Sequence, residues 1–189
     1  DEKGEVVEGG KVAKKTERKT LNSMKALWTR PKDEITDPEY DEFYRHVTRD
    51  WGKPFDRLHV KVEGMQEYTA LMYLPERAPF DLFTRESRRG LQLYVKHVFI
   101  MDECRELMPE YLRFVRGLVD SPDLPLNVSR EMVQQDRVIA AMRKTLTRKW
   151  LGRFQELLTD ERERYEKLWG EFGQAIKEGF HYEPKNKDR

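Results

Sequence analysis

The spacing of apolar residues changes from a helical period to a strand period and back, and this change constrains the fold more than any other feature of the chain. Over residues 40–47 apolar side chains recur every three or four positions, which predicts a helix. Thr36 and Glu39 precede this stripe at the spacing of a capping box. Two stretches of alternating apolar residues, 58–62 and 68–74, then predict an antiparallel hairpin.

The middle of the chain continues this strand pattern before helical spacing returns. Residues 91–101 are almost continuously apolar or β-branched, which predicts one central strand. We expect a helix over residues 107–117 and a short strand at 117–120. Helical spacing then covers residues 129–158 and resumes from Asp160 to Gly179, so the chain should end in two long helices.

This element order predicts an α/β fold: a three-layer α/β/α-type sandwich with a mixed sheet, followed by long C-terminal helices. Residues 1–22 hold three glycines, one leucine and no aromatic residue, and we expect a flexible charged linker there. Residues 23–158 should form the α/β core. A helical extension over 159–182 and a polar tail over 183–189 complete the predicted organisation.

Composition excludes several functional classes. The chain has 36 Lys and Arg against 35 Asp and Glu, and its net charge of +1 gives no general attraction for nucleic acid or an anionic membrane. No apolar run approaches the roughly 18 residues of a membrane span. The single cysteine, Cys104, excludes an internal disulfide framework and fits a reducing, cytoplasmic compartment. We expect it to be a small apolar core residue.

Motifs of free-standing enzymes are absent from the sequence. It contains no GxxxxGKS/T, no GxGxxG after a strand and no GxSxG, so nothing in it would hold a nucleotide unaided. Four histidines and one cysteine, without HExxH or CxxC, predict no metal site. We therefore expect no enzyme activity from this chain on its own. Because it begins at Asp1 and ends in PKNKDR, we expect it to be a segment of a longer protein.

The most informative stretch is DSPDLPLNVSREMVQQ, residues 120–135. Two prolines stiffen a loop that delivers polar residues to a helix N-terminus, where Ser129 is a candidate N-cap. Arg130 would then lie in the first turn, where the helix macrodipole disfavours a cation. Two interpretations stay open: a local ion pair with a nearby carboxylate, or an arginine positioned to meet an anion such as a phosphate. In the second case Gln134 lies one turn further along the same face.

Several blocks of sequence carry a family resemblance. The blocks are LWTRPKDEIT, RAPFDLF, LYVKHVFIMD, MPEYLRFVRGLVDSPDLPLN and LNVSREMVQQ. In this order and spacing they resemble the middle domain of the ninety-kilodalton heat-shock chaperones (heat shock protein 90). The segments IMDEC and YLRFVRG resemble those of the bacterial branch of the family, HtpG. The resemblance covers roughly residues 26–182.

The resemblance implies a dimeric, ATP-driven, cytoplasmic chaperone. An N-terminal ATPase domain would bind ATP and Mg²⁺, a C-terminal domain would form the homodimer, and this chain would lie between them. In the family, an arginine and a glutamine of the middle domain reach the γ-phosphate of ATP in the closed dimer. The motif match puts these roles on Arg130 and Gln134, with Asn127 in the supporting loop beside the nucleotide.

The resemblance also implies a surface for client proteins, which are unfolded or partly folded chains. An aromatic residue of the LWTR block and an amphipathic hairpin would supply it, and these positions fall on Trp28 and on Val60, Val62 and Met65. Burial of Trp28 in the core is the alternative, because tryptophan is highly buried on average. If Trp28 and Met65 are exposed, they would form one apolar patch suited to promiscuous binding.

A third surface and a competing function remain. Arg77 and Phe80 lie in a segment that, in the family, is near the N-terminal domain; the alternative is that Phe80 fills the edge of the sheet core. The competing function is a generic protein-interaction module, or nucleic-acid binding by basic residues of the long helix, although a solvated helix face is the simpler interpretation. These basic residues are Arg137, Arg143, Lys144, Arg148, Lys149 and Arg153.

Overall fold

The computed structural model of this chain describes residues 25–84, 90–127, 129, 131, 133 and 136–182. The strands of this part form one mixed sheet in the order β1-β2-β5-β3-β4. β5 runs antiparallel to β2 and parallel to β3, and the outer pairs are antiparallel. Their bounds are Pro54–Val62 (β1), Tyr68–Pro75 (β2), Leu91–Val95 (β3), Val98–Cys104 (β4) and Arg116–Ser121 (β5).

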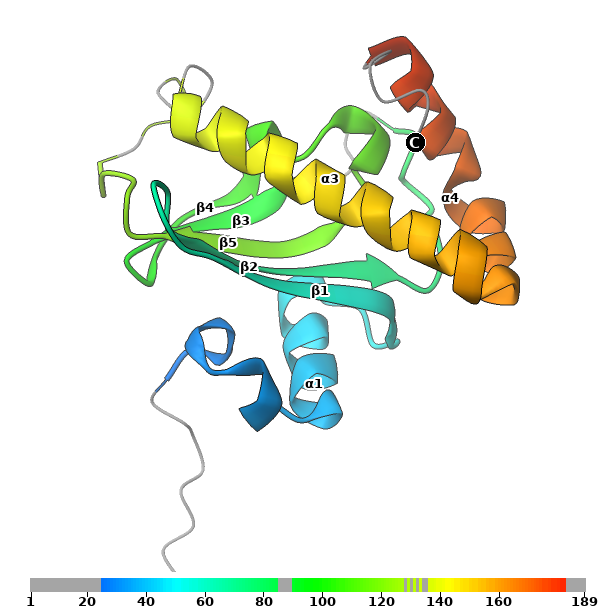
Figure 1. Ribbon diagram of the computed structural model, residues 1–189, viewed down its shortest axis with the longest axis horizontal. Helices are drawn as coiled ribbons and strands as arrows, with labels where there is room; N and C mark the ends of the chain where they lie inside the picture. The colour runs from blue at the N-terminus through cyan, green and yellow to red at the C-terminus, as the bar shows by residue number, and fades with distance from the viewer. Residues whose placement is uncertain are drawn as a thin grey trace, which may run out of the picture.

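Helices cover both faces of the sheet. α1 (Asp37–Thr48) and two 3₁₀ turns, Leu27–Thr29 and Lys32–Glu34, lie on one face, and α3 (Arg137–Asp160) crosses the other (Figure 1). α4 (Arg162–Tyr182) follows and packs beside α3. The expected three-layer α/β/α sandwich with a mixed sheet and long C-terminal helices is confirmed.

Alternate side chains along β2 pack into two separate hydrophobic cores, one on each face of the sheet. In β2, Leu71 and Tyr73 pack with Tyr44 of α1, whereas Met72 and Leu74 belong to the larger cluster that contains Trp150 of α3. Successive strand residues point to opposite faces, so a strand buried on both faces must be apolar at every position. Apart from the half-buried Thr69, the YTALMYL sequence meets this requirement, and β2 accordingly lies inside the sheet.

The predicted capping pair and hairpin are confirmed. The Glu39 carboxylate accepts hydrogen bonds from the Thr36 backbone N–H (2.8 Å) and hydroxyl (2.9 Å) at the start of α1. The Arg30 guanidinium and these Thr36 donors lower the pKa of Glu39 from 4.5 to about 2. β1 and β2 pair antiparallel, with Val62 opposite Tyr68.

The single strand predicted over residues 91–101 is wrong. The chain reverses at Lys96 and His97, whose φ angles are 51° and 66°, and forms the β3–β4 hairpin instead. Left-handed backbone is uncommon for residues other than glycine, so an apolar run gives no sign of such a turn.

The helix predicted over residues 107–117 is also wrong. Two 3₁₀ turns, Arg105–Leu107 and Glu110–Leu112, take its place, and β5 follows directly. Nearly every residue from Leu107 to Val115 is buried, whereas a surface helix buries only one stripe. The conformation of this segment therefore follows from its burial on nearly all sides and not from the helical spacing of its apolar residues.

Both long C-terminal helices are present, with shifted ends. α3 begins at Arg137, where the Asp136 side chain accepts hydrogen bonds from the N–H groups of Val138 and Ile139. Asp136, not Ser129, is thus the N-cap of this helix. α4 continues beyond Gly179 to Tyr182. The predicted linker over residues 1–22 and tail over 183–189 lie outside the described residues.

Candidate functional site

Three loops meet at one end of the sheet, at the left of Figure 1: the tip of the β1–β2 hairpin, the β3–β4 turn and the loop after β5. A cavity of about 360 Å³ lies among them. Its lining includes Glu63 and Glu67 from the first loop, Lys96 and His97 from the second, and Pro122 from the third. This end of the molecule carries the stretch that the sequence singled out.

The loop after β5 is anchored on both sides. The Ser121 hydroxyl donates to the Glu67 carbonyl (2.7 Å), and the Asp123 carboxylate accepts from the Glu67 N–H (2.6 Å). Leu124 and Val133, at the two ends of the loop, are each only 2% exposed. The loop is therefore tied to the β1–β2 hairpin and to the core at fixed points.

The polar residues described between these anchors face solvent. Asn127, Ser129 and Glu131 are all exposed. Arg130 and Gln134, the two predicted catalytic residues, lie outside the described residues, and their roles remain predictions.

A buried carboxylate joins two of the three loops to the N-terminal segment. Asp120, at the end of β5, is 4% exposed. It accepts hydrogen bonds from the Trp28 indole N–H (2.8 Å), from the His97 backbone N–H (3.1 Å) and from His97 Nδ1 (2.5 Å). The left-handed backbone at His97 brings its N–H and its ring to the same carboxylate. A buried charge needs such partners, because an unpaired one would be costly.

Trp28 lies in the core, which is the alternative that the sequence left open. It is 9% exposed, and its ring packs against Phe43 and Tyr94 at centroid distances of 5.7 and 4.9 Å. Its carbonyl accepts from His59 Nε2 (3.0 Å), while His59 Nδ1 faces the Tyr40 hydroxyl (2.8 Å). Burial lowers the pKa of His59, which favours the neutral ring, and in this form Nε2–H donates to the Trp28 carbonyl while Nδ1 can accept from the Tyr40 hydroxyl.

The predicted client-binding residues lie on different faces. Trp28 packs on the α1 side of the sheet, whereas Val60, 8% exposed, belongs to the core on the α3 side and Val62 packs partly against it. Met65 at the hairpin tip is fully exposed. Trp28 and Met65 therefore do not form one exposed patch.

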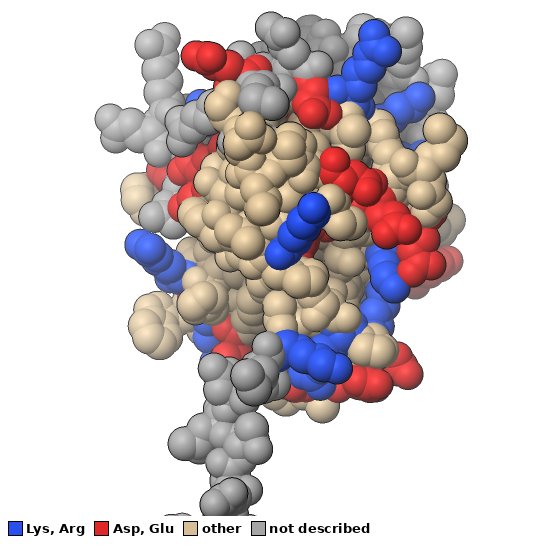
Figure 2. Space-filling view, turned by 90° about the vertical axis from the view of Figure 1, so that its left-hand side faces the viewer, with Lys and Arg blue, Asp and Glu red and all other residues tan. Residues whose placement is uncertain are grey.

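Other apolar side chains are exposed at this end of the sheet. Val98 (51%), Phe99 (52%) and Leu126 (53%) extend from the β3–β4 hairpin and the loop after β5. Figure 2 shows this end as a broad area of uncharged residues interrupted by few charged ones. We call Met65, Val98, Phe99 and Leu126 the apolar end. The sequence did not indicate Val98 and Phe99 because it placed them inside a central strand.

The predicted interdomain residues are both exposed. Phe80 is fully exposed, and Leu82 rather than Phe80 fills the core at the edge of the sheet. Arg77 is also exposed. The Ala78 N–H donates to Glu171 of α4 (2.8 Å) and so holds this segment in place.

Two further candidates, Cys104 and Arg153, have structural contacts. Burial raises the pKa of the Cys104 thiol to about 12, which keeps it protonated and confirms a small apolar role. Arg153 of the basic helix is bound to Asp56 (2.7 Å) and Glu161 (3.1 Å). Within the described residues no cluster of three or more His, Cys, Asp or Glu side chains could hold a metal ion. In the same part of the chain no helix is long and apolar enough to cross a membrane.

Comparison with known proteins gives a consistent result. The family model "Hsp90 protein" matches residues 1–189. The chain is 54% identical over 181 residues to the chaperone protein HtpG of Frankia casuarinae, covering 96% of this chain and 28% of the relative. It is 50% identical over 186 residues to HtpG of Geobacter sulfurreducens, covering 98% and 29%. The chain thus spans less than a third of the length of these relatives.

A solved structure has the same fold. The middle domain of a Plasmodium falciparum heat shock protein superposes with a TM-score of 0.74 at 26% sequence identity. The match covers 85% of this chain and 62% of that one.

Proposed function

This chain belongs to the Hsp90 family, with the fold of its middle domain, and from this premise we propose that it completes the ATPase site of an N-terminal domain. Arg130 would supply the charge that meets the γ-phosphate, with Gln134 beside it and Asn127 in the supporting loop. ATP and Mg²⁺ would be held mainly by the N-terminal domain. A C-terminal domain would form the homodimer, and partly folded proteins would be the clients.

The proposed mechanism follows from electrostatics. A guanidinium is always charged, and its planar donors fit phosphate oxygens. If it docks only when two domains close, it stabilises the charge that develops on the transferred phosphoryl group, and hydrolysis then depends on closure. Arginines that act in this way in other nucleotide hydrolases raise the rate by about 10³–10⁵.

The observation that carries the proposal is the identity of 50–54% to HtpG chaperones over nearly the whole chain. The described flanks of the loop support it. Anchors at Leu124 and Val133 hold the ends of the loop against the core, while Asn127 and Glu131 between them are exposed. A residue that completes another domain's site needs this combination of a fixed base and an accessible face.

Arg130→Ala in the full-length chaperone tests this role. We expect ATP turnover to fall by about a hundredfold or more, because the charge on the transferred phosphoryl group loses its partner. ATP binding should stay within about threefold, since the N-terminal domain holds most of the nucleotide. Steady-state hydrolysis and titration with a fluorescent ATP analogue measure the two quantities.

Arg137→Ala is the matched control, because Arg137 is an exposed arginine at the start of α3. It should leave turnover nearly unchanged. Near-normal turnover in Arg130→Ala, or an equal loss in both variants, would remove Arg130 from the mechanism.

We propose the apolar end as the client-binding surface that the structure supports best. Met65 is unbranched and polarizable and can adapt to varied partners, and Val98, Phe99 and Leu126 extend the exposed apolar area. Met65→Glu in this chain should weaken binding of a reduced, partly folded test protein by about tenfold, with no change in thermal stability. Phe180→Glu, at an exposed phenylalanine of α4, is the control. Equal binding by wild type and Met65→Glu would contradict the proposal.

We propose that Phe80 packs on the N-terminal domain. Its full exposure beside a fixed backbone segment supports this role. Phe80→Ala in the full-length protein should slow ATP turnover without loss of stability, because an exposed ring contributes little to the fold. Unchanged turnover would exclude a coupling role.

A further inference from the structure

The turn that follows α1 is held rigidly. Asp50 accepts hydrogen bonds from the buried Tyr44 hydroxyl (2.8 Å) and from the Gly52 N–H (2.9 Å), and its own N–H donates to the Thr48 hydroxyl (3.1 Å). Arg49 adopts a left-handed conformation, with φ of 58°. Non-glycine residues in this region are uncommon and mark a conformation that the surroundings enforce. The backbone at Trp51 is therefore fixed on both sides.

This rigid turn presents a bare indole to solvent. Trp51 is 92% exposed and makes no ring contact with the described residues. By contrast, Trp28 and Trp150 are 9% and 0% exposed. Tryptophan is usually highly buried. When it lies at the surface, it is over-represented among the residues that contribute most of the binding energy of protein–protein interfaces. Trp51 contributes nothing to either core, so core packing does not explain its presence in the turn.

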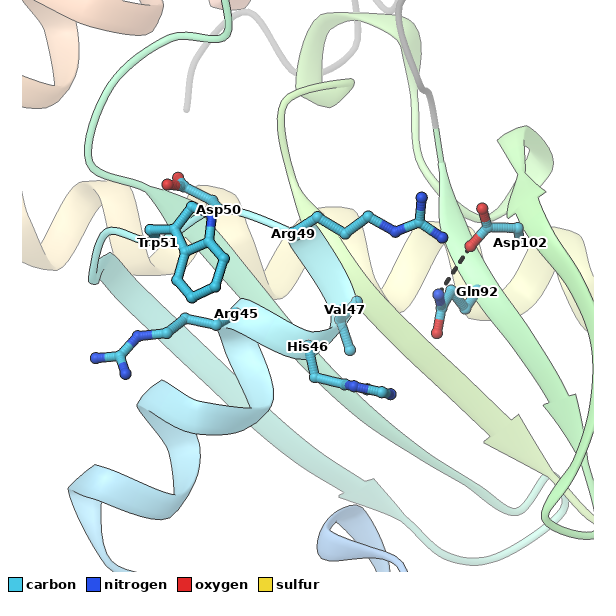
Figure 3. Close-up of a pocket in the computed structure, with 8 residues that line it drawn as sticks. All are labelled: Arg45, His46, Val47, Arg49, Asp50, Trp51, Gln92 and Asp102. Carbon is cyan, nitrogen blue, oxygen red and sulfur yellow. Dashed lines mark hydrogen bonds between the residues drawn. The ribbon is translucent and has the colours of Figure 1, made fainter.

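Two arginines flank the indole without partners. The guanidinium groups of Arg45 and Arg49 form no hydrogen bond or ion pair with any residue that the structure describes, and both are exposed. Figure 3 shows Arg49 directed toward Asp102 and Gln92 and Arg45 directed away from them. Cations are favourable at a helix C-terminus, which accounts for their positive charge but not for the exposed tryptophan beside them.

A cavity of about 660 Å³ lies among these side chains. Its two acidic residues accept hydrogen bonds from neutral donors: Asp50 from the Tyr44 hydroxyl and the Gly52 N–H, and Asp102 from the Gln92 amide (2.8 Å). Within the described residues neither carboxylate pairs with a guanidinium, so Arg45 and Arg49 leave unpaired guanidinium donors at the cavity. A carboxylate is the group that best matches those donors, because it can accept two parallel hydrogen bonds from one guanidinium.

We propose that Arg45, Arg49 and Trp51 form a docking surface for a partner protein that presents acidic side chains beside an apolar one. The unpaired guanidinium donors of Arg45 and Arg49 select the acidic partner, and an indole carried on a well-held backbone supplies an apolar anchor. A small ligand fits less well, because small-molecule sites bury most of the ligand and this indole is open on nearly all sides. The surface lies on the α1 side of the sheet.

Fluorine NMR of this chain labelled with fluorotryptophan tests the proposal. The four tryptophan signals are distinguished by single Trp→Phe variants, and Trp51→Phe identifies the relevant one. The probes are three synthetic peptides in which leucine alternates with glutamate, with glutamine or with lysine. We expect the glutamate peptide to shift the Trp51 signal selectively, and the affinity to fall as salt is raised.

The double variant Arg45→Glu/Arg49→Glu should weaken this binding by about tenfold or more, because two attractive charges become repulsive. Arg148→Glu, at an exposed arginine of α3 on the other face of the sheet, should leave it unchanged. The proposal is overturned if the Trp51 signal does not move at millimolar glutamate peptide, or if the glutamine or lysine peptide moves it equally. A shift that depends only on the concentration of the chain itself would also overturn it, in favour of self-association.

Discussion

Single residues at the end of the sheet act by joining segments that are distant in the sequence. Asp120 is the clearest case, since it links Trp28, which is 92 positions away, and His97, which is 23 away. Its carboxylate thereby ties the N-terminal segment to the β3–β4 turn at the base of the loop after β5. The hydrogen bonds of Asp120 therefore hold the chain in a fixed position just before this loop.

Trp28→Phe measures what the indole contact contributes. Phenylalanine keeps an aromatic ring between Phe43 and Tyr94 but removes the N–H that Asp120 accepts, so part of the hydrogen bonding of a buried carboxylate is lost. We expect the free energy of unfolding to fall by about 1–3 kcal/mol in urea titrations. Trp169→Phe, at a tryptophan that is 36% exposed, should change it by less than about 0.5 kcal/mol. Equal effects would show that the Asp120 contact carries no stability.

Among the elements, β5 depends on one glycine. Gly117 has φ of 133°, and a Cβ added there would lie 2.1 Å from the Leu71 carbonyl oxygen and 2.8 Å from the Met72 Cα. Both atoms belong to the backbone of β2, the neighbouring strand, and cannot turn aside as a side chain would. The close approach of the two strands at this point therefore requires glycine.

Gly117→Ala should reduce the free energy of unfolding by at least about 2 kcal/mol. Alanine would have to adopt a φ that is unfavourable for it, and its Cβ would clash with the backbone of β2. Gly152→Ala is the control: this glycine lies in α3 with nothing within 4 Å of the added Cβ, so alanine should stabilise the helix by up to about 1 kcal/mol. Denaturant titration of both variants compares them. A tolerated Gly117→Ala would contradict the close contact between β2 and β5.

At the scale of the whole molecule, ion pairs attach the last helix to the body of the fold. Arg113, 5% exposed, donates to both oxygens of Glu178 in α4 (2.6 and 2.9 Å) and to the Leu82 carbonyl (2.9 Å). A second group, centred on Arg153, connects Asp56 of β1 with Glu161 between the two long helices. These contacts fix α4 against the segment before β5, and they fix the end of α3 and the junction with α4 against β1.

Glu178→Gln tests the first attachment. It leaves the buried Arg113 charge without its counter-charge, and removal of one partner of a buried pair costs about 3–5 kcal/mol. Because Glu178 is 32% exposed, we expect a loss nearer about 2–3 kcal/mol by thermal unfolding. Glu166→Gln, which breaks an exposed pair with Arg162 on the same helix, should cost less than about 0.5 kcal/mol. A loss as small in Glu178→Gln would show that α4 does not depend on Arg113.

Elements whose signals are local were predictable from the amino-acid sequence alone. The capping pair of α1, the β1–β2 hairpin and the apolar stripes of α3 and α4 each depend on residues within a few positions of one another, and all are present. The three-layer sandwich followed from their order. The blocks of family sequence indicated the Hsp90 family, which the comparisons confirm.

Features that depend on distant partners became visible only in the folded chain. The turn at Lys96 and His97, the 3₁₀ turns between Arg105 and Leu112 and the burial of Trp28 are of this kind. Residues 107–115 are buried on nearly every side, so they lack the single exposed face that periodicity records. The turn at His97 and the position of Trp28 depend on Asp120, which is too far away in the sequence to leave a local pattern.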